Sequence, residues 1–397
     1  MFQVSRFKFH LLPLFLLFLP CAAQADNWMS RLPDDAYVSV LSIPGSHDSA
    51  TGSGWAEGME DLGEAFARTQ DLTIAQQWTL GIRAFDLRPC SYEDRMNLNH
   101  GIIPTVLSME GVLAELRDSL AANPSEFVII HMRHESEGDQ VENVFDQRIQ
   151  SLLRSDDFQG LFVDFNKALR VRDMRGKILV ISRDKYASAP IGGFFQNWTG
   201  EANWNKQQQL KIVGSKSSGT ASGIVQDYSE TWQNGALQTK VDAINKLLTY
   251  STTHKTTSVS SIRWIFNFAS AFARVESLFG YNISTSDGYR DNASVTHAAI
   301  LDFLQTHDPG PTGVILMDYV GVESSNGFST RGREVVETII QNNFLYLLEP
   351  SDAVGALPVV SLAPAARYTL NGQPASARQG LFIETRPGAQ ARKVLLK

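Results

Sequence analysis

The sequence has 397 residues, 43% of them hydrophobic, so it is long enough to form a large buried core. Its formal net charge is -7 at pH 7, and this acidity argues against nucleic acid as a partner, because phosphate backbones attract proteins rich in Lys and Arg. The same acidity argues against attachment to an anionic membrane by bulk charge alone.

The first 25 residues have the pattern of a secretory signal peptide. Arg6 and Lys8 precede an apolar stretch at 11–20, which is too short to span a bilayer, and a small-residue cleavage site follows at 23–25. We therefore expect a secreted protein, extracellular or periplasmic. Removal of the segment takes the formal charge from -7 to -9 because both basic residues are lost. Cys21 is lost with it, so no internal disulfide is expected.

Short apolar runs, rich in β-branched or aromatic residues and bounded by turn signals, predict seven buried strands. They lie at 37–43, 81–87, 126–132, 176–182, 222–228, 263–269 and 313–319. Helices are predicted between several of them, at 109–123 (with Ser108 as N-cap), 141–155, 236–250 and 332–343. This alternation favours an α/β fold with a parallel sheet, open or closed into a barrel. The long gap at 44–81 and the loop-rich stretch at 183–222 argue against a regular barrel.

The composition changes after residue 349. Residues 358–397 contain six Lys or Arg and one acidic residue, Glu384, and the Asn371-Gly372 pair is a turn signal between short apolar pieces. The expected division is a signal peptide at 1–25, a barrel domain at 26–348, and a small C-terminal β appendage or tail at 349–397.

Polar side chains stand where the predicted strands end. The stretch IPGSHDSA at 43–50 turns through Pro44-Gly45 and then presents His47 and Asp48. In GIRAFDLR, Asp86 and Arg88 point the same way, since side chains alternate along a strand. The stretch LNHG then places His100 before a glycine.

Further charged residues stand at the ends of four other predicted strands: Arg133 with Glu135, Arg183, Asp227 and Asp318. The C-terminal face of a parallel barrel is where active sites are built. We therefore expect these side chains to share one site.

The motifs IPGSHDSA, GIRAFDLR and LNHG, followed by the closing Asp318-Tyr319, resemble in sequence and order the bacterial phosphatidylinositol-specific phospholipases C, the X-domain family. The resemblance spans residues 35–345. It implies a distorted (β/α)8 TIM-like barrel that cleaves phosphatidylinositol to diacylglycerol and inositol 1,2-cyclic phosphate.

That reaction needs a base, an acid and a cation. The lipid carries a hydroxyl beside its phosphodiester, so the enzyme deprotonates this hydroxyl, stabilises charge on the phosphoryl group and protonates the leaving glycerol oxygen. His47 and His100 are suited to be base and acid because imidazole titrates near neutral pH. Arg88 offers a permanently charged fork to phosphate oxygens.

The resemblance assigns the supporting roles. It implies that Asp318 orients His47, that Asp48 supports His100 and that Asp86 helps to hold the cationic site. It also implies substrate contacts by Arg133, Arg183, Asp227 and Tyr228. Two departures weaken this second group, since the family has a Lys where Arg133 stands and places its stacking Tyr one residue further from the Asp than Tyr228 is from Asp227.

A metal-dependent phosphodiesterase on the same scaffold is the first alternative. Five residues could serve as ligands for a hard cation: His47, Asp48, Asp86, Glu135 and Asp318. The calcium-using relatives have a carboxylate where Arg88 stands, and a guanidinium there would repel a cation. We therefore expect neither a metal nor another cofactor.

The second alternative is a catalytically dead lipid-binding protein. It is suggested by apolar residues in two presumed loops, Phe194, Phe195 and Trp198 in the first and 277–282 in the second. A dead barrel should have lost at least one of the three catalytic groups, and all three remain. The same loops are our candidates for membrane contact by a monomer acting on phosphatidylinositol. The sequence leaves open whether glycosylphosphatidylinositol-anchored proteins are cleaved as well.

Overall fold

The computed structural model describes residues 25–184, 191–196, 198, 208–216, 219–229, 231, 236–272, 275–278 and 281–347, and three strands at 366–368, 380–385 and 392–396. The chain divides into two compact units, with the boundary between Leu347 and Leu348. The predicted signal peptide, apart from Ala25, lies outside the described residues. No helix in the described ranges is long and apolar enough to cross a membrane.

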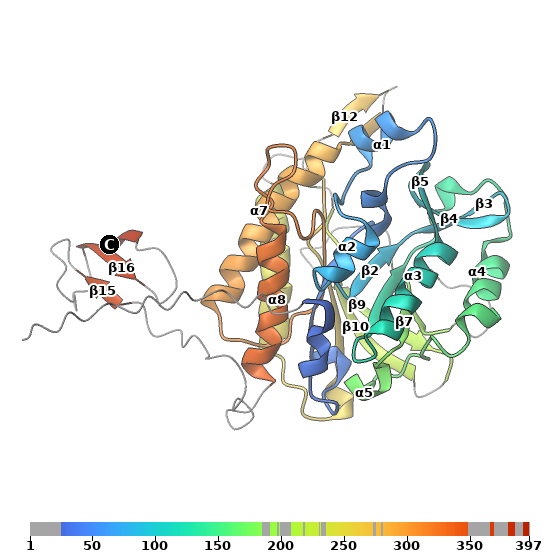
Figure 1. Ribbon diagram of the computed structural model, residues 1–397. Coiled ribbons are helices and arrows are strands. Elements are labelled where there is room, and N and C mark those ends of the chain that lie inside the picture. Colours follow the sequence, from blue (N-terminus) through green and yellow to red (C-terminus); the bar gives the residue numbers. More distant parts are fainter. Residues whose placement is uncertain are drawn as a thin grey trace, which may run out of the picture. The chain divides into compact units, whose positions relative to one another are not determined.

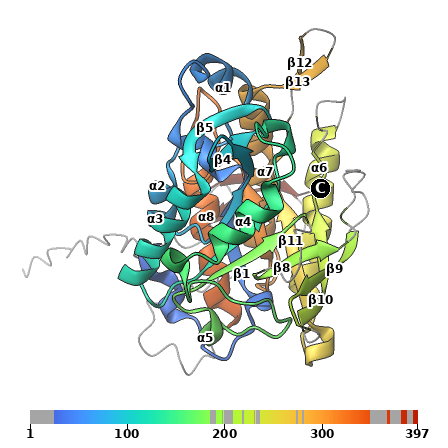
Figure 2. The same ribbon diagram turned by 90° about the vertical axis from the view of Figure 1, so that its right-hand side faces the viewer.

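Nine strands of the larger unit close into a barrel in the order β1-β14-β11-β10-β9-β8-β7-β6-β2 (Figures 1 and 2). They are β1 (Ser42–Ser46), β2 (Ala84–Leu87), β6 (Val128–Met132), β7 (Ile178–Ser182), β8 (Gly193–Gln196), β9 (Gln208–Gly214), β10 (Thr220–Gln226), β11 (Arg263–Phe268) and β14 (Gly313–Met317). Strand β9 is antiparallel to both of its neighbours, and all other neighbouring pairs are parallel. The predicted distorted barrel is confirmed, and the inserted antiparallel strand is its main irregularity.

The connections between the strands differ in kind. Helices α1 (Glu60–Phe66) and α2 (Ile74–Thr79) follow β1. A separate antiparallel sheet of β3 (Pro89–Tyr92), β4 (Arg95–His100) and β5 (Ile103–Ser108), and then α3 (Met109–Ala122), follow β2. Later connections contain α4 (Phe145–Leu153), α5 (Val171–Met174), α6 (Ala236–Thr253), the hairpin β12 (Val275–Leu278) with β13 (Tyr281–Ser284), α7 (Ser286–Thr306), and finally α8 (Gly332–Tyr346). The part of 183–219 that the structure describes contains no helix.

Six of the seven predicted strands and all four predicted helices occur within a few residues of the expected ranges, and Ser108 caps α3 by accepting the Gly111 N–H. The first predicted strand is displaced. Val38–Val40 is a 3-10 turn, and β1 starts at Ser42 and runs through Pro44 and Gly45, which were expected to form a turn. A Cβ atom at Gly45 would lie 2.7 Å from Leu316 and 2.9 Å from Ala84, so the glycine lets β14 and β2 approach β1 closely.

The predicted aromatic membrane anchor of the 190s is wrong for Phe195. This side chain is 2% exposed, and its ring centroid lies 5.2 Å from Phe266 inside the barrel. The stretch that was read as a loop is strand β8, so its side chains alternate and Phe195 points into the core. Phe194 is half-buried, and Trp198 packs 5.0 Å from Phe195. The other candidate, 277–282, overlaps the β12–β13 hairpin, and its side chains lie outside the described residues.

The smaller unit contains a three-stranded antiparallel sheet of β15 (Ala366–Tyr368), β16 (Gly380–Thr385) and β17 (Arg392–Leu396). This sheet lies within the range predicted as a β appendage or tail, 349–397. The Asn371-Gly372 turn signal lies outside the described residues.

Candidate active site

Six predicted site residues share one position in the fold. Each is the first residue beyond the carboxyl end of a barrel strand: His47 after β1, Arg88 after β2, Arg133 after β6, Arg183 after β7, Asp227 after β10 and Asp318 after β14. The carboxyl ends of parallel strands meet at one end of a barrel. The barrel thus brings together groups that are up to 271 residues apart in the sequence.

A cavity of about 420 Å³ opens at this end of the barrel. Six of the ten predicted site residues line it: His47, Arg88, His100, Arg133, Arg183 and Asp227. Asp48, Asp86 and Asp318 are at most 2% exposed, and they bond the lining residues His47 and Arg88. Tyr228 does not line the cavity. Gln226 faces outward to α6 and Asp227 faces the cavity, so strand alternation turns Tyr228 outward again.

His47 is held at both ring nitrogens. Its Nδ1 lies 2.7 Å from Oδ1 of Asp318, and its Nε2 lies 2.7 Å from Nη2 of Arg88. A guanidinium has donors only, so Nε2 accepts from Arg88 and the ring hydrogen is on Nδ1, directed at Asp318. Burial and the Arg88 charge hold the pKa of His47 well below its ordinary value, so the ring is neutral at neutral pH. This is the tautomer that a general base at Nε2 requires.

Asp318 is the acceptor of that hydrogen bond, with Oδ1 2.7 Å from Nδ1 of His47. Burial and the Asp48 charge raise the pKa of Asp318 well above its ordinary value. The predicted orienting role of Asp318 fits this contact.

Arg88 is fixed by the two other buried carboxylates. Its Nε lies 2.9 Å from Oδ1 of Asp48, and its Nη2 lies 3.1 Å from Oδ2 of Asp86. Although burial opposes it, the charges of Arg88 and His131 lower the pKa of Asp86 well below its ordinary value. Asp86 therefore remains ionised and anchors the guanidinium.

Asp48 occupies a strained and central position. Its φ of 43° is in the left-handed region, which Asp tolerates better than most residues. Oδ2 of Asp48 has no hydrogen-bond partner among the described residues, yet it lies 3.4 Å from Nε2 of His47 and 3.7 Å from Nε2 of His100. Burial raises the pKa of Asp48 to about 6, and Arg88 opposes the shift. The carboxylate is therefore close enough to stabilise the positive charge on either imidazole when that ring is protonated.

His100 stands at the end of β4, outside the barrel strands. Its Nδ1 lies 2.7 Å from the carbonyl oxygen of Ala67, and its Nε2 faces the cavity. The separation of 3.7 Å from Asp48 is longer than a hydrogen bond, so Asp48 bonds Arg88 and is only an ion-pair neighbour of His100.

Three of the four predicted substrate-contact residues, Arg133, Arg183 and Asp227, also line the cavity. Nη1 of Arg183 lies 3.9 Å from Oδ2 of Asp227, and its guanidinium stacks 4.7 Å over the Trp198 ring. Nε of Arg133 lies 3.6 Å from Oε2 of Glu135. The cavity therefore carries three guanidinium groups, partly balanced by carboxylates, which suits an anionic ligand with polar substituents.

Sequence reasoning missed His131 and Tyr289, and it named Glu135 only as a strand-end carboxylate and a candidate metal ligand. Glu135 accepts the Gly101 N–H at 2.9 Å and so fixes the loop after His100. Nδ1 of His131 lies 2.7 Å from Oδ1 of Asp86, its register partner on the neighbouring strand. Tyr289 approaches His100 from α7. For His131 the signal was a polar residue inside the apolar run VIIHM.

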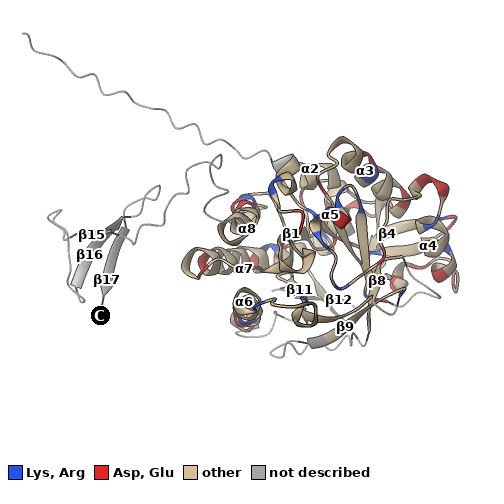
Figure 3. Ribbon diagram, turned by 90° about the horizontal axis from the view of Figure 1, so that it is seen from below, with Lys and Arg blue, Asp and Glu red and all other residues tan. Residues whose placement is uncertain are grey.

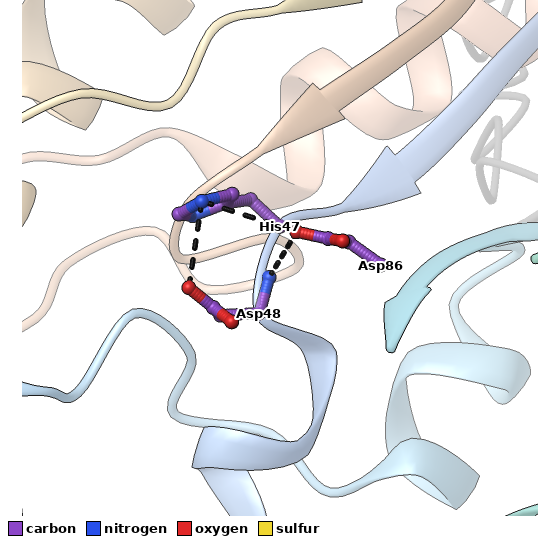
Figure 4. A group of neighbouring side chains, drawn as sticks. All are labelled: His47, Asp48 and Asp86. Atoms are coloured by element: carbon purple, nitrogen blue, oxygen red, sulfur yellow. Dashed lines mark hydrogen bonds and ion pairs between the residues drawn. The ribbon is translucent and has the colours of Figure 1, made fainter. Parts of the chain in front are cut away.

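The three groups of the metal-ligand hypothesis that lie closest together are His47, Asp48 and Asp86 (Figure 4). Each of them is already bonded to the Arg88 guanidinium. A cation among these atoms would have to displace a fixed positive charge, so the residues present do not fit a metal ion.

Comparisons with known proteins agree with this geometry, although no family model matches the chain. A 1-phosphatidylinositol phosphodiesterase of Listeria monocytogenes is 34% identical over 171 residues, which are 40% of this chain and 49% of that protein. One of Staphylococcus aureus is 24% identical over 305 residues, 75% of this chain and 88% of that protein. The chain thus spans about half the length of the first relative and most of the second.

A solved structure of the Staphylococcus aureus phosphatidylinositol-specific phospholipase C superposes with a TM-score of 0.63 at 23% identity, covering 80% of this chain and 97% of that one. The similarity to bacterial phosphatidylinositol-specific phospholipases C that the motifs predicted is confirmed, and so is the barrel fold.

Proposed function

We propose that this chain is a secreted phospholipase C that cleaves phosphatidylinositol to diacylglycerol and inositol 1,2-cyclic phosphate without a metal ion. The observation that carries the proposal is that two imidazoles and the Arg88 guanidinium line one cavity, where Arg88 bonds His47 and Asp48, and Oδ2 of Asp48 lies 3.4 Å from Nε2 of His47 and 3.7 Å from Nε2 of His100. His47 has the base tautomer, and His100 offers Nε2 on the other side.

The reaction balances with these groups alone. Nε2 of His47 takes the proton of the inositol 2-hydroxyl, and the 2-oxygen attacks phosphorus. Arg88 stabilises the charge on the phosphoryl oxygens. The bond from phosphorus to the glycerol oxygen breaks, and Nε2 of His100 donates a proton to that oxygen. The products are the cyclic phosphodiester and neutral diacylglycerol, with His47 protonated and His100 neutral.

Arg88 also controls when the base is available. In the structure its Nη2 occupies the lone pair of His47 Nε2. A phosphate that draws this nitrogen toward its own oxygens releases the lone pair for the 2-hydroxyl. The base is therefore freed by the substrate that it deprotonates.

Two further parts of the proposal rest on the sequence and on the relatives. Secretion is supported by the signal-peptide pattern at 1–25. Action at a membrane, with phosphatidylinositol as substrate, is supported by the activity after which the relatives are named. Cleavage of glycosylphosphatidylinositol anchors requires the same bond to be accessible and is a second substrate to assay.

The test is phosphorus NMR of phosphatidylinositol vesicles incubated with the purified protein and excess chelator. We expect the signal of a five-membered cyclic phosphodiester to appear at the expense of the lipid signal. An acyclic first product would contradict the mechanism, and loss of turnover on chelation, restored by added calcium, would contradict metal independence.

A further inference from the structure

His100 presents one nitrogen to the reaction and uses the other for attachment. Its Nδ1 lies 2.7 Å from the carbonyl oxygen of Ala67, which can only accept, so Nδ1 carries a hydrogen. Nε2 is therefore the nitrogen that gains and loses the catalytic proton. One attachment point leaves the ring free to tilt about the Nδ1 hydrogen bond, so a second contact is needed to aim Nε2.

Tyr289, a residue distant in the sequence, supplies such a contact. Its hydroxyl oxygen lies 3.3 Å from Nε2 of His100, 189 residues away, and the two ring centroids are 5.7 Å apart at an interplanar angle of 48°. Tyr289 lines the same cavity and is only 4% exposed. Its place is set by the start of α7, where the Thr285 hydroxyl caps the helix by accepting the Gly288 N–H at 3.0 Å.

The Tyr289 hydroxyl is itself held by a second hydroxyl. Its oxygen lies 2.6 Å from Oγ of Ser284, the last residue of β13. Burial raises the pKa of Tyr289, so the group keeps its hydrogen. A hydroxyl can accept from a protonated Nε2 and donate to a neutral one, and the Ser284 hydroxyl can reverse its direction to match. The contact therefore persists in both protonation states of His100.

We propose that Tyr289 is a positioning residue for His100, which aims the Nε2 proton at the leaving glycerol oxygen in the reaction proposed above. The inference rests on that proposed function and goes beyond it by adding a residue that touches the acid and not the base. Tyr289 lies on α7, whereas the partners of His47 lie at the ends of β2 and β14. Loss of its hydroxyl should therefore affect protonation of the leaving group selectively.

The experiment compares Tyr289→Phe with the wild type on two substrates. One is phosphatidylinositol in mixed micelles, whose alkoxide leaving group needs a proton. The other is the nitrophenyl ester of inositol 1-phosphate, whose leaving group needs little help. We expect kcat on the lipid to fall ~10- to 100-fold with little change in KM, and kcat on the nitrophenyl ester to fall less than about threefold.

Tyr346→Phe is the matched control. Tyr346 is a partly buried tyrosine, and its hydroxyl donates to the Val40 carbonyl and contacts Ser42 at the opposite end of β1 from His47. Its removal should lower the thermal midpoint without separating the two substrates. Should Tyr289→Phe fold poorly, Ser284→Ala removes the second hydroxyl and should give the same substrate pattern with a smaller loss.

The outcomes separate the two proposals. Equal losses on both substrates, or an unchanged rate on the lipid, would overturn the role of Tyr289 while leaving the phospholipase function standing. A wild-type protein that cleaves neither substrate would instead overturn the proposed function. The selective loss, seen in Tyr289→Phe and absent in Tyr346→Phe, would support the inference.

Discussion

The two histidines differ in what they bond, and that difference assigns their roles. His47 pairs with a carboxyl and accepts from an arginine, whereas His100 is bonded to a backbone carbonyl and a phenol hydroxyl. Arg88 can only donate, so it keeps Nε2 of His47 unprotonated, whereas the Tyr289 hydroxyl can bond Nε2 of His100 with or without its proton. The sequence could propose a base and an acid from the presence of two histidines, but it could not show which tautomer each one holds.

Alanine substitutions should separate the two histidines. We expect His47→Ala and His100→Ala each to lower kcat on phosphatidylinositol by roughly 10²- to 10⁴-fold, because each removes one proton transfer. On the nitrophenyl ester, only His100→Ala should recover, since a good leaving group needs no acid. Rescue of His47→Ala in place of His100→Ala would reverse the assignment.

Arg88 makes three contacts at once, which a lysine cannot reproduce. Its guanidinium bonds Asp48, Asp86 and His47 through a planar fork. We expect Arg88→Lys to lower kcat by roughly 10²- to 10³-fold on the lipid and on the nitrophenyl ester alike, because both transition states carry the same phosphoryl charge.

Arg133→Lys is the control for this substitution, because Arg133 lines the same cavity and the resemblance noted in the sequence implies a lysine at this position. The kcat of Arg133→Lys should remain within about threefold of the wild-type value in the same two assays. Full activity of Arg88→Lys would show that a point charge suffices and that the bidentate geometry has no role.

At the scale of elements, the apolar runs predicted the parallel strands well but did not reveal β8 and β9. The glycines at 192 and 193 suggested a flexible loop, yet they permit close packing. A Cβ atom at Gly192 would lie 1.9 Å from the Val180 carbonyl oxygen, and one at Gly193 would lie 2.9 Å from Phe165. In a sequence, a glycine that allows close packing looks the same as a glycine in a flexible loop. The sequence alone therefore could not distinguish the two.

Helix α7 escaped prediction for a different reason. It buries Arg290, Asn292 and His297 against the barrel, so its inner face lacks the apolar periodicity by which helices are recognised. Tertiary hydrogen bonds pair part of each polar group, for example from Nδ2 of Asn292 to the Ala269 carbonyl, whereas Oδ1 of Asn292 and Nε2 of His297 have no hydrogen-bond partner among the described residues. Because α7 was missed, Tyr289 was missed with it.

The contact between α6 and β10 buries a cation. Lys240 is fully buried, and its Nζ bonds Oε1 of Gln226 and the carbonyl oxygen of Tyr228. Burial lowers the pKa of Lys240 from 10.5 to about 7. Between these two pH values the unfolded chain carries a proton that the folded chain lacks, so this group makes the fold more stable as pH rises.

We therefore expect the difference in free energy of unfolding between the wild type and Lys240→Met to move in favour of the wild type from pH 7 to pH 10.5. Urea unfolding at a series of pH values would measure it. Lys246→Met, an exposed position on the same helix, controls for loss of a lysine. A difference that stays flat, or moves the other way, would contradict the buried-cation account.

The β4–β5 connection replaces the 190s stretch as the candidate for membrane contact. Ile102 is 74% exposed and directly follows Gly101, which lines the cavity. An apolar side chain so exposed at the entrance of a lipid-cleaving site is suited to enter the acyl region of a bilayer.

We expect Ile102→Ser to lower activity on phosphatidylinositol vesicles by roughly tenfold, the effect of one apolar side chain, and to spare the soluble nitrophenyl ester. Val259→Ser is the control, because Val259 is 41% exposed and precedes the amino end of β11, away from the cavity. Equal losses on vesicles and on the soluble ester would show that Ile102 supports the loop and not membrane binding.

At the scale of the whole molecule, the two units differ in what they contain. The candidate active site lies in the larger unit, and the sequence of the smaller unit is rich in positive charge. All the site residues described above precede Leu347, where the barrel unit ends. Positive and negative residues are interspersed along the barrel (Figure 3), whereas residues 358–397 contain six Lys or Arg and one acidic residue. The barrel therefore has what catalysis needs, and we expect the appendage to act through its charge.

A chain that ends at Glu349 should retain the wild-type rate on the soluble ester. Its binding to anionic vesicles should weaken less steeply with added salt than that of the full chain, because screening acts on the charges that were removed. Sedimentation with vesicles at several salt concentrations measures this slope. Identical slopes would exclude an electrostatic contact by the appendage, and loss of the soluble activity would show that the barrel depends on it.

The placement of six site residues one step beyond a strand has a consequence for how such a protein can change. Their backbone positions are set by the hydrogen-bond ladder of the barrel, while their side chains lie outside its core. Natural selection or a designer could replace Arg133, Arg183 or Asp227 without rebuilding the scaffold, and the neighbouring base, acid and guanidinium would stay in register. Head groups of other shapes and charges are therefore within reach of single substitutions at these three positions.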